Sequence, residues 1–107
     1  MKVESLVRDI TKKYETLANP IRIHILSIIS ALEEASWSEI KAIFEKLHGQ
    51  INPNTLAFHI KKLVDCGFVS KIGSPESPVY IAKIPEELRR ELEEIIKFYK
   101  EFVEGKQ

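Results

Sequence analysis

The sequence predicts a mainly α-helical chain that carries one small β-hairpin towards its C-terminal end. Three observations predict this class. Apolar residues recur at steps of three and four along five separate segments. Asn-Pro pairs and a Ser-x-x-Glu spacing mark helix starts between those segments. Two short runs with β-branched residues flank a segment of glycine, serine and proline, which is typical of a hairpin.

The first two helices follow from their apolar spacing. Residues 3–17 carry an amphipathic stripe of Val3, Leu6, Val7, Ile10, Tyr14 and Leu17. Asn19 and Pro20 begin the second helix, because asparagine caps a helix and proline fits its first turn. This helix runs to Leu32 and is so apolar that we expect it to lie in the core.

The third and fourth helices form a helix-turn-helix unit. Ser36 and Glu39 have capping-box spacing, and the third helix runs from there to about Leu47. The segment "HGQI" is the predicted turn, which makes the unit about one helical turn longer than a compact one. Asn52 and Pro53 start the fourth helix, residues 53–66, and Gly67 ends it in the left-handed conformation.

The hairpin and a last helix complete the chain. Strands are predicted over Phe68–Ile72 and Val79–Lys83, with the six residues "GSPESP" as the loop between them. Pro85 begins a helix over residues 86–103, and acids in its first turn suit the positive end of the helix dipole. We expect one domain over residues 1–107, with its core over about 17–83.

Composition restricts the class of protein. The 107 residues are 44% hydrophobic and 30% charged, as in a globular chain, and no apolar run is long enough to span a bilayer. The single Cys66 fits a reducing compartment, so we expect a cytoplasmic protein. Net charge is zero, but the segment from Lys41 to Lys71 contains five lysines and only two acids. A neutral total can therefore hide a basic surface.

Two segments resemble a known family. "LANPIRIHILSII" (17–29) is similar to the opening core helix of ArsR-type winged helix-turn-helix repressors, and "NTLAFHIKKLVDCGFV" (54–69) to their recognition helix and wing entry. Related archaeal-type winged-helix regulators share these features. The resemblance implies a winged helix with additional N- and C-terminal helices, whose fourth helix enters the DNA major groove. Ala57, Phe58 and the acidic wing-tip Glu76 depart from the family pattern.

The predicted partner is therefore double-stranded DNA. Lysines of the fourth helix would neutralise phosphates, and polar residues of its first turn would reach base edges. Phe58 would contact a thymine methyl or fold back on the core, and for His59 a packing role is favoured over a phosphate contact. The candidate DNA-binding residues are Asn54, Thr55, Phe58, His59, Lys61, Lys62, Ser36, Ser38, Arg22 and Lys71.

The two terminal helices carry more apolar surface than a small core needs. One interpretation packs them on each other within the monomer. The other, which matches the family's habit, makes them a homodimer interface that places two recognition helices about one DNA turn apart. The candidate dimerisation residues are Leu6, Ile10, Leu88, Leu92, Ile95, Ile96, Tyr99 and Val103.

Metal sensing and catalysis find no support in the sequence. His24, His48, His59 and Cys66 lack metal-ligand spacing, and no phosphate loop or nucleophile motif occurs. We therefore expect no metal, no cofactor, no membrane association and no enzymatic activity. The prediction is a homodimeric, sequence-specific transcription regulator. The alternative is a winged-helix protein-protein interaction module that does not read DNA sequence, which zero net charge, Glu76 and the Ala57-Phe58 pair favour.

Overall fold

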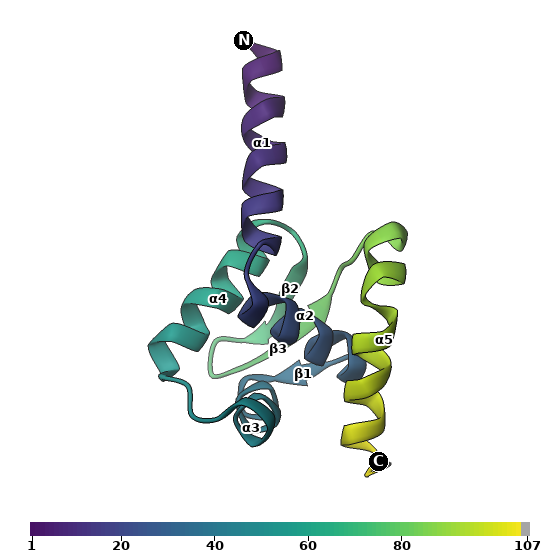
Figure 1. Cartoon of the computed structure of the whole chain (residues 1–107). Helices are drawn as coiled ribbons and strands as arrows, with labels where there is room; N and C mark the ends of the chain where they lie inside the picture. The colour runs from purple at the N-terminus through teal and green to yellow at the C-terminus, as the bar shows by residue number, and fades with distance from the viewer. Residues whose placement is uncertain (106–107) are drawn as a thin grey trace.

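The computed structural model describes residues 1–105 and arranges them around a central helix (Figure 1). Within these residues, five helices and three short strands follow one another. In order they are α1 (Lys2–Leu17), α2 (Pro20–Leu32), β1 (Ala35–Ser36), α3 (Trp37–His48), α4 (Pro53–Asp65), β2 (Val69–Ser74), β3 (Ser77–Ala82) and α5 (Glu86–Val103).

The helix starts lie where the sequence predicts them. Asn19 accepts hydrogen bonds from the backbone of Ile21 and Arg22 at the start of α2. The side chain of Ser36 accepts from the Glu39 backbone, while the Glu39 carboxylate accepts from the Ser36 backbone, so the capping box is confirmed. These reciprocal bonds satisfy backbone donors that a helix cannot pair internally.

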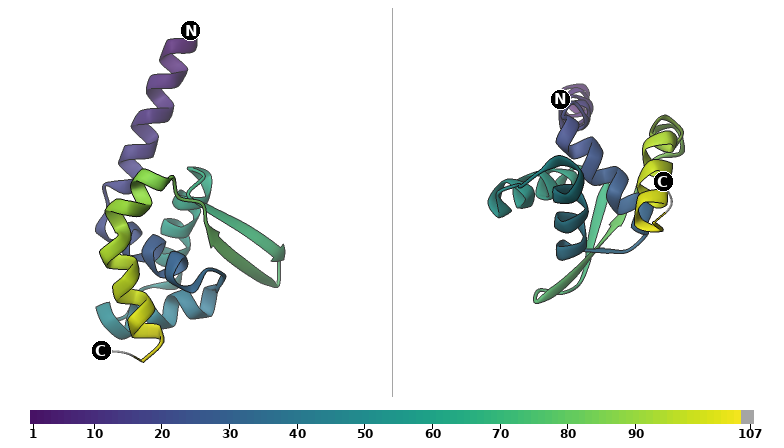
Figure 2. Two further views of the ribbon diagram at one scale, coloured as in Figure 1. Left: turned by 90° about the vertical axis from the view of Figure 1, so that its right-hand side faces the viewer. Right: turned by 60° about the horizontal axis from the view of Figure 1, so that its bottom comes forward.

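The sheet differs from the prediction in two ways. The strands run through most of the expected six-residue loop, because Gly73 pairs with Pro78 and Ser74 with Ser77, which leaves Pro75 and Glu76 as the turn. The sheet also has a third strand, since β1 pairs antiparallel with β3, in the order β1-β3-β2. A two-residue strand carries no periodicity, so the sequence pattern does not reveal it. The β2–β3 hairpin projects from the body (Figure 2).

The core is built around α2, as the sequence predicts. Four apolar α2 residues are fully buried, and α3, α4, α5 and the sheet each pack against this helix. The α5 side chains that pack on α2 are themselves buried. The core residues are Ile25, Leu26, Ile28, Ile29, Ala35, Ile40, Phe44, Leu56, Ile60, Leu63, Phe68, Val69, Tyr80, Leu92, Ile96 and Tyr99.

Helix α1 projects away from this body (Figures 1 and 2). Within it only Thr16 is buried, and the apolar side chains towards its N-terminus are exposed. The interpretation that the terminal helices cover each other within one chain is therefore wrong for most of α1. Its C-terminal end alone reaches α5, where Tyr14, Leu17, Leu88 and Leu92 share a groove.

No helix in the described part of the chain has both the length and the apolar character to cross a membrane.

Candidate nucleic-acid interface

Helix α4 is fixed at both ends by hydrogen bonds that its sequence dictates. The Asn52 side chain accepts from the Asn54 backbone at the start. At the end, Gly67 adopts φ +84°, and the Gly67 and Phe68 backbone N–H groups donate to Val64 and Leu63. This pattern is a Schellman motif, in which glycine takes the left-handed position at low cost. A helix capped in this way presents its outer face rigidly.

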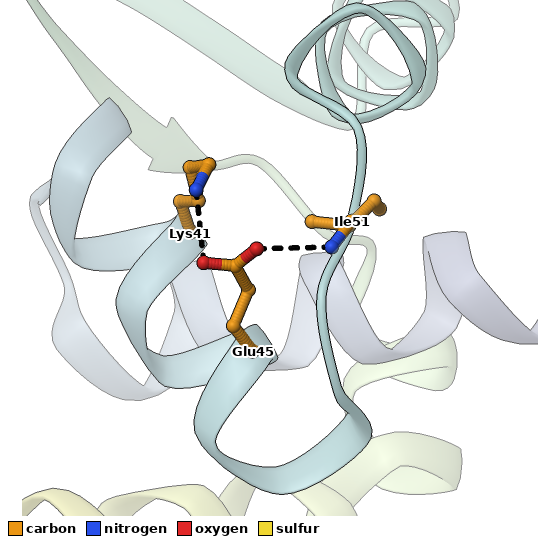
Figure 3. A network of polar contacts seen from close by, with 3 residues as sticks. All are labelled: Lys41, Glu45 and Ile51. Carbon is orange, nitrogen blue, oxygen red and sulfur yellow. Dashed lines mark hydrogen bonds and ion pairs between the residues drawn. The ribbon is translucent and has the colours of Figure 1, made fainter.

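The turn before α4 is held by a carboxylate of α3. Glu45 accepts hydrogen bonds from the Lys41 ammonium and from the Ile51 backbone N–H, both at 2.9 Å (Figure 3). The bond to Lys41, followed by the bond to Ile51, lowers the pKa of Glu45 below its ordinary value. One side chain thus joins α3 to the residue just before the Asn52 cap and helps to orient α4 relative to α3.

The outward face of α4 carries polar, charged and aromatic side chains. Asn54, Phe58, Lys61 and Asp65 recur at steps of three and four, and all are exposed. Thr55 lies exposed in the first turn, and Asn54 lies beside it. The opposite face, formed by Leu56, His59, Ile60 and Leu63, is buried. Helix α4 is therefore divided into a buried face, which includes His59, and an exposed polar face.

Phe58 lies between two cations on the surface. Its ring is 51% exposed, so it does not fold back onto the core. The Arg22 guanidinium carbon and the Lys62 ammonium lie 5.8 and 5.3 Å from the ring centroid, within the range of cation–π attraction. Together these three side chains form what we call the Phe58 cluster, an exposed aromatic ring with two positive charges near it.

His59 and Arg22 have structural roles. His59 is only 7% exposed, and its Nδ1 accepts a hydrogen bond of 3.1 Å from Nε of Arg22. Burial, followed by the Arg22 charge, lowers the pKa of His59. Arg22 also donates to the carbonyl of Thr16 at the end of α1. His59 is therefore wrongly placed among the DNA contacts, because its ring is covered, and Arg22 offers DNA only the part of its side chain that these bonds leave accessible.

Lys61 is exposed but has a partner in its own helix. Its ammonium lies 2.8 Å from the Asp65 carboxylate, one turn further along. The hydrogen bond from Lys61 lowers the pKa of Asp65, and Lys12 of α1 and Lys62 add to the effect. From the sequence, Lys61 is predicted to bind phosphate. In the structure the Asp65 carboxylate already pairs with it and would compete with a phosphate. Exposed pairs of this kind are weak, so DNA can displace the carboxylate.

A groove runs between α4 and the hairpin. Its volume is about 370 Å³, and exposed Lys61 and Lys71 belong to its two sides. The aromatic residues Trp37 and Tyr80 also line this groove, and neither is among the candidates predicted from the sequence. The lining residues are Trp37, Ala57, Ile60, Lys61, Val64, Lys71 and Tyr80.

The remaining candidates divide between accessible and committed groups. Ser38 is exposed, whereas the Ser36 hydroxyl is bonded to the Glu39 backbone as the α3 cap. Glu76 occupies the exposed hairpin turn, so the tip carries a negative charge.

Two solved structures share this architecture. Reduced HlyU from Vibrio cholerae N16961 is 19% identical, with a TM-score of 0.64 over 92% of this chain and 96% of its own. The homodimeric winged helix-turn-helix DNA-binding domain Mb0332 from Mycobacterium bovis, a possible ArsR-family transcriptional regulator, is 20% identical, with a TM-score of 0.64 over 97% and 90%. The chain has a winged helix-turn-helix fold. The predicted resemblance to ArsR-type winged-helix proteins is thus confirmed at the level of the fold, in which α3 and α4 form the helix-turn-helix and β2–β3 the wing.

Sequence comparisons alone find neither a matching family model nor a matching curated protein. At identities near 20%, the structural likeness establishes the winged helix and leaves the functional residues to be argued from this chain itself.

For three residues, the predicted assignment to a dimer interface is wrong. Leu92, Ile96 and Tyr99 are buried within a single chain, against α2. Leu6, Ile10 and Val103 are exposed, and Leu88 and Ile95 are half-buried, so these five stay available to a partner. Phe98, 52% exposed, was missed because it lies beside the main α5 stripe.

In the described residues of this winged helix, histidine, cysteine, aspartate and glutamate form no group of three or more that could hold a metal ion.

Proposed function

We propose that this chain is a homodimeric, sequence-specific transcription regulator that binds double-stranded DNA with α4 in the major groove. It acts in the cytoplasm by occupying DNA and not by catalysis. The observation that supports this function best is the outward face of α4. A helix locked at both ends presents Asn54 and Thr55 in its first turn and the Phe58 cluster one turn later. These positions are those at which recognition helices meet base edges.

Each part of this face has a role in the proposal. Asn54 and Thr55 offer hydrogen-bonding groups to base edges, and the Phe58 ring offers apolar contact to a thymine methyl. Lys62 lies at the Phe58 ring and Lys71 is exposed on β2, so both can neutralise phosphates, and Lys61 joins them once DNA displaces Asp65.

The homodimer rests on the exposed apolar face of α1. Val3, Leu6, Val7, Ile10 and Tyr14 are each more than half exposed. A contiguous apolar stripe of this size on one helix is typical of a protein–protein contact. The Mycobacterium bovis neighbour, which shares the fold, is homodimeric. A two-fold dimer would place two α4 helices on a pseudo-palindromic site.

Three features favour the alternative of a protein-binding winged helix. Lys61 is neutralised by Asp65, and the wing tip carries Glu76, so the face is less basic than its lysine count indicates. An exposed phenylalanine between two cations also suits a protein partner. The experiment below separates the two functions.

The test is fluorescence anisotropy of the full chain on a duplex from upstream of its own gene, beside a scrambled duplex. We expect tighter binding to the first duplex and a steep fall of affinity with salt, because lysine–phosphate contacts release counterions. The Lys61→Ala/Lys62→Ala variant should lower the slope of log affinity against log salt by roughly 0.9 for each phosphate that the variant no longer neutralises.

The matched control is Lys97→Ala/Lys100→Ala, which removes the same charge from α5, across the body from α4 (Figure 1). It should leave the slope and affinity close to those of the wild type. Equal, weak binding to both duplexes with no dependence on Lys61 and Lys62 would contradict DNA reading and favour the protein-binding alternative.

A further inference from the structure

A buried tyrosine joins two histidines where α2, α3 and α5 meet. The Tyr99 hydroxyl of α5 lies 2.8 Å from Nδ1 of His24 on α2 and 2.7 Å from Nε2 of His48 on α3. Tyr99 is 1% exposed, His24 is half-buried and His48 is exposed. Three helices therefore meet at one hydroxyl, which lies at the end of α3, directly before the turn to α4.

The chemistry of the hydroxyl limits the protonation states. A phenol has one hydrogen to donate, so it can donate to only one of the two imidazoles. The other imidazole then donates its N–H to the phenol oxygen. The network is complete while one of the two facing nitrogens carries a hydrogen and the other is bare. Burial keeps the phenol protonated by raising the pKa of Tyr99 to about 12.

A first proton fits this network and a second does not. His48 is at the surface, and protonation of its free Nδ1 leaves its Nε2–H bond to Tyr99 intact. Protonation of His24 at Nδ1 would give Tyr99 two N–H donors and leave its own hydrogen without an acceptor. It would also place two positive rings with centroids 4.3 Å apart. Like charges this close are costly in a partly buried site.

Among the described residues, the groups in contact with the two imidazoles include no carboxylate. The titratable groups that face the cluster are His24 from α2, His48 from α3 and Tyr99 from α5, with the uncharged Phe44 ring 4.9 Å from His48. On α3, Lys46 lies over the Phe102 ring of α5, and Glu45 is bonded to Lys41 and Ile51. Over residues 1–105, neither imidazole forms an ion pair with an acid.

We propose that His24, Tyr99 and His48 form a proton-sensitive latch, which fastens the second half of α5 to α2 and to the end of α3 and loosens when acidification places a charge on both imidazoles. The latch goes beyond the proposed DNA binding and does not depend on it. It gives the chain a response to acid at the junction between the terminal helix and the helix-turn-helix.

The direction of the pH response follows from His24. Burial, followed by the nearby His48, lowers the pKa of His24 below 6.5. The latch therefore contributes fully above about pH 6.5, loses its contribution as pH falls from there through the lower pKa of the folded chain, and changes no further below it. His59 has a lowered pKa for its own reasons and adds a separate acid response, so it has to be controlled.

The first test is an NMR titration of the wild-type full chain, with ring signals of the three histidines assigned through single His→Gln variants. We expect His24 to titrate below pH 6.5 and the Tyr99 ring and α5 amide signals to shift with the same midpoint. Titration of His24 at or above its ordinary value, with Tyr99 and α5 signals unchanged, would overturn the proposal. The titration itself is followed in the wild type, and the His→Gln variants serve only to assign its signals.

The second test measures the folding equilibrium constant by urea between pH 8 and pH 5. One linked proton changes this constant by up to about tenfold per pH unit. His24→Gln should remove that share of the wild-type dependence, whereas the control His59→Gln should keep it. Tyr99→Phe retains the ring and should uncouple the α5 amide signals from His24. A His24→Gln variant with the full wild-type dependence would contradict a proton-sensitive latch.

Discussion

The two terminal helices share one pattern and have opposite fates. Both α1 and α5 carry an apolar stripe on an otherwise charged helix. In α5 the stripe is closed against α2, and Ile96 is 4% exposed. In α1 the stripe faces outward, and Ile10 is 56% exposed. The difference lies in the connection, since α5 returns along α2 after the hairpin, whereas α1 meets α2 only at its last turn (Figure 1).

This comparison shows what an amphipathic pattern can and cannot predict. Periodicity indicates that one face of a helix will be covered, but it does not say by which surface. A face closed within the chain acts on folding, and a face left open acts on assembly. The predictions below separate these two roles, beginning with the largest expected effect.

Removing a core side chain from α5 should have the largest effect. Ile96→Ala leaves a cavity against α2 and should lower the free energy of unfolding by about 2–5 kcal/mol, measured by urea denaturation. Ile10→Ala is the matched control on α1 and should cost far less at protein concentrations too low for dimers. Equal losses from both substitutions would show that α1 belongs to the monomer core.

Charging the exposed α1 stripe should break assembly and leave the fold intact. Leu6→Asp/Ile10→Asp removes two apolar side chains per chain from the proposed contact, each worth roughly 1.5–3 kcal/mol when buried. The dimer dissociation constant should therefore rise at least about a hundredfold. Size-exclusion chromatography with light scattering checks the mass, and circular dichroism checks that helix content is kept. The control on the same helix is Thr11→Asp, which adds a charge outside the apolar stripe and should leave the dimer intact. In the wild type the Thr11 hydroxyl donates to the Val7 carbonyl.

Removing the α4 cap should have a moderate effect. Asn52→Ala leaves the Asn54 backbone N–H without its acceptor and should cost about 1 kcal/mol of unfolding free energy. Since α1 begins without a side-chain cap, no α1 residue offers an equivalent loss. Amide exchange in the first turn of α4 should accelerate in this variant, and unchanged exchange there would show that the cap does not hold the reading helix.

The Glu45 bridge should show the smallest effect at neutral pH and a larger one in acid. Its pKa is lowered by Lys41 and Ile51, so its contribution is present above about pH 4.5 and is lost as pH falls through the folded-state pKa. In Glu45→Gln, the hydrogen-exchange rate of the Ile51 amide should be higher than in the wild type near pH 6. The difference between the two rates should shrink by pH 3. A difference that persists at pH 3 would contradict this origin.

The sequence predicts most of the fold for identifiable reasons. Asn19, Ser36, Asn52 and Gly67 encode their caps locally, and each is found as expected. The extended hairpin and β1 were missed because strand pairing across Gly73–Pro78 depends on a partner strand and not on local pattern.

The candidate site was less predictable, because side-chain pairing is a tertiary property. His59 reads as a helix residue beside two lysines, yet it is covered and bonded to Arg22, 37 positions earlier. Lys61 reads as a free cation, although the spacing to Asp65 is visible in the sequence and could have predicted their pairing. His24, His48 and Tyr99 carry no spacing signal at all, since three separate helices bring them together.

The central claim is that two copies of this chain join through α1 and bind one duplex. Sedimentation velocity of the wild type and of Leu6→Asp/Ile10→Asp, each with and without the upstream duplex, tests it most directly. We predict a wild-type mass of twice the 12.3 kDa chain, two chains per duplex, and a monomeric variant with weaker DNA binding. A wild-type monomer that binds one chain per duplex, unaffected by the α1 charges, would contradict the account.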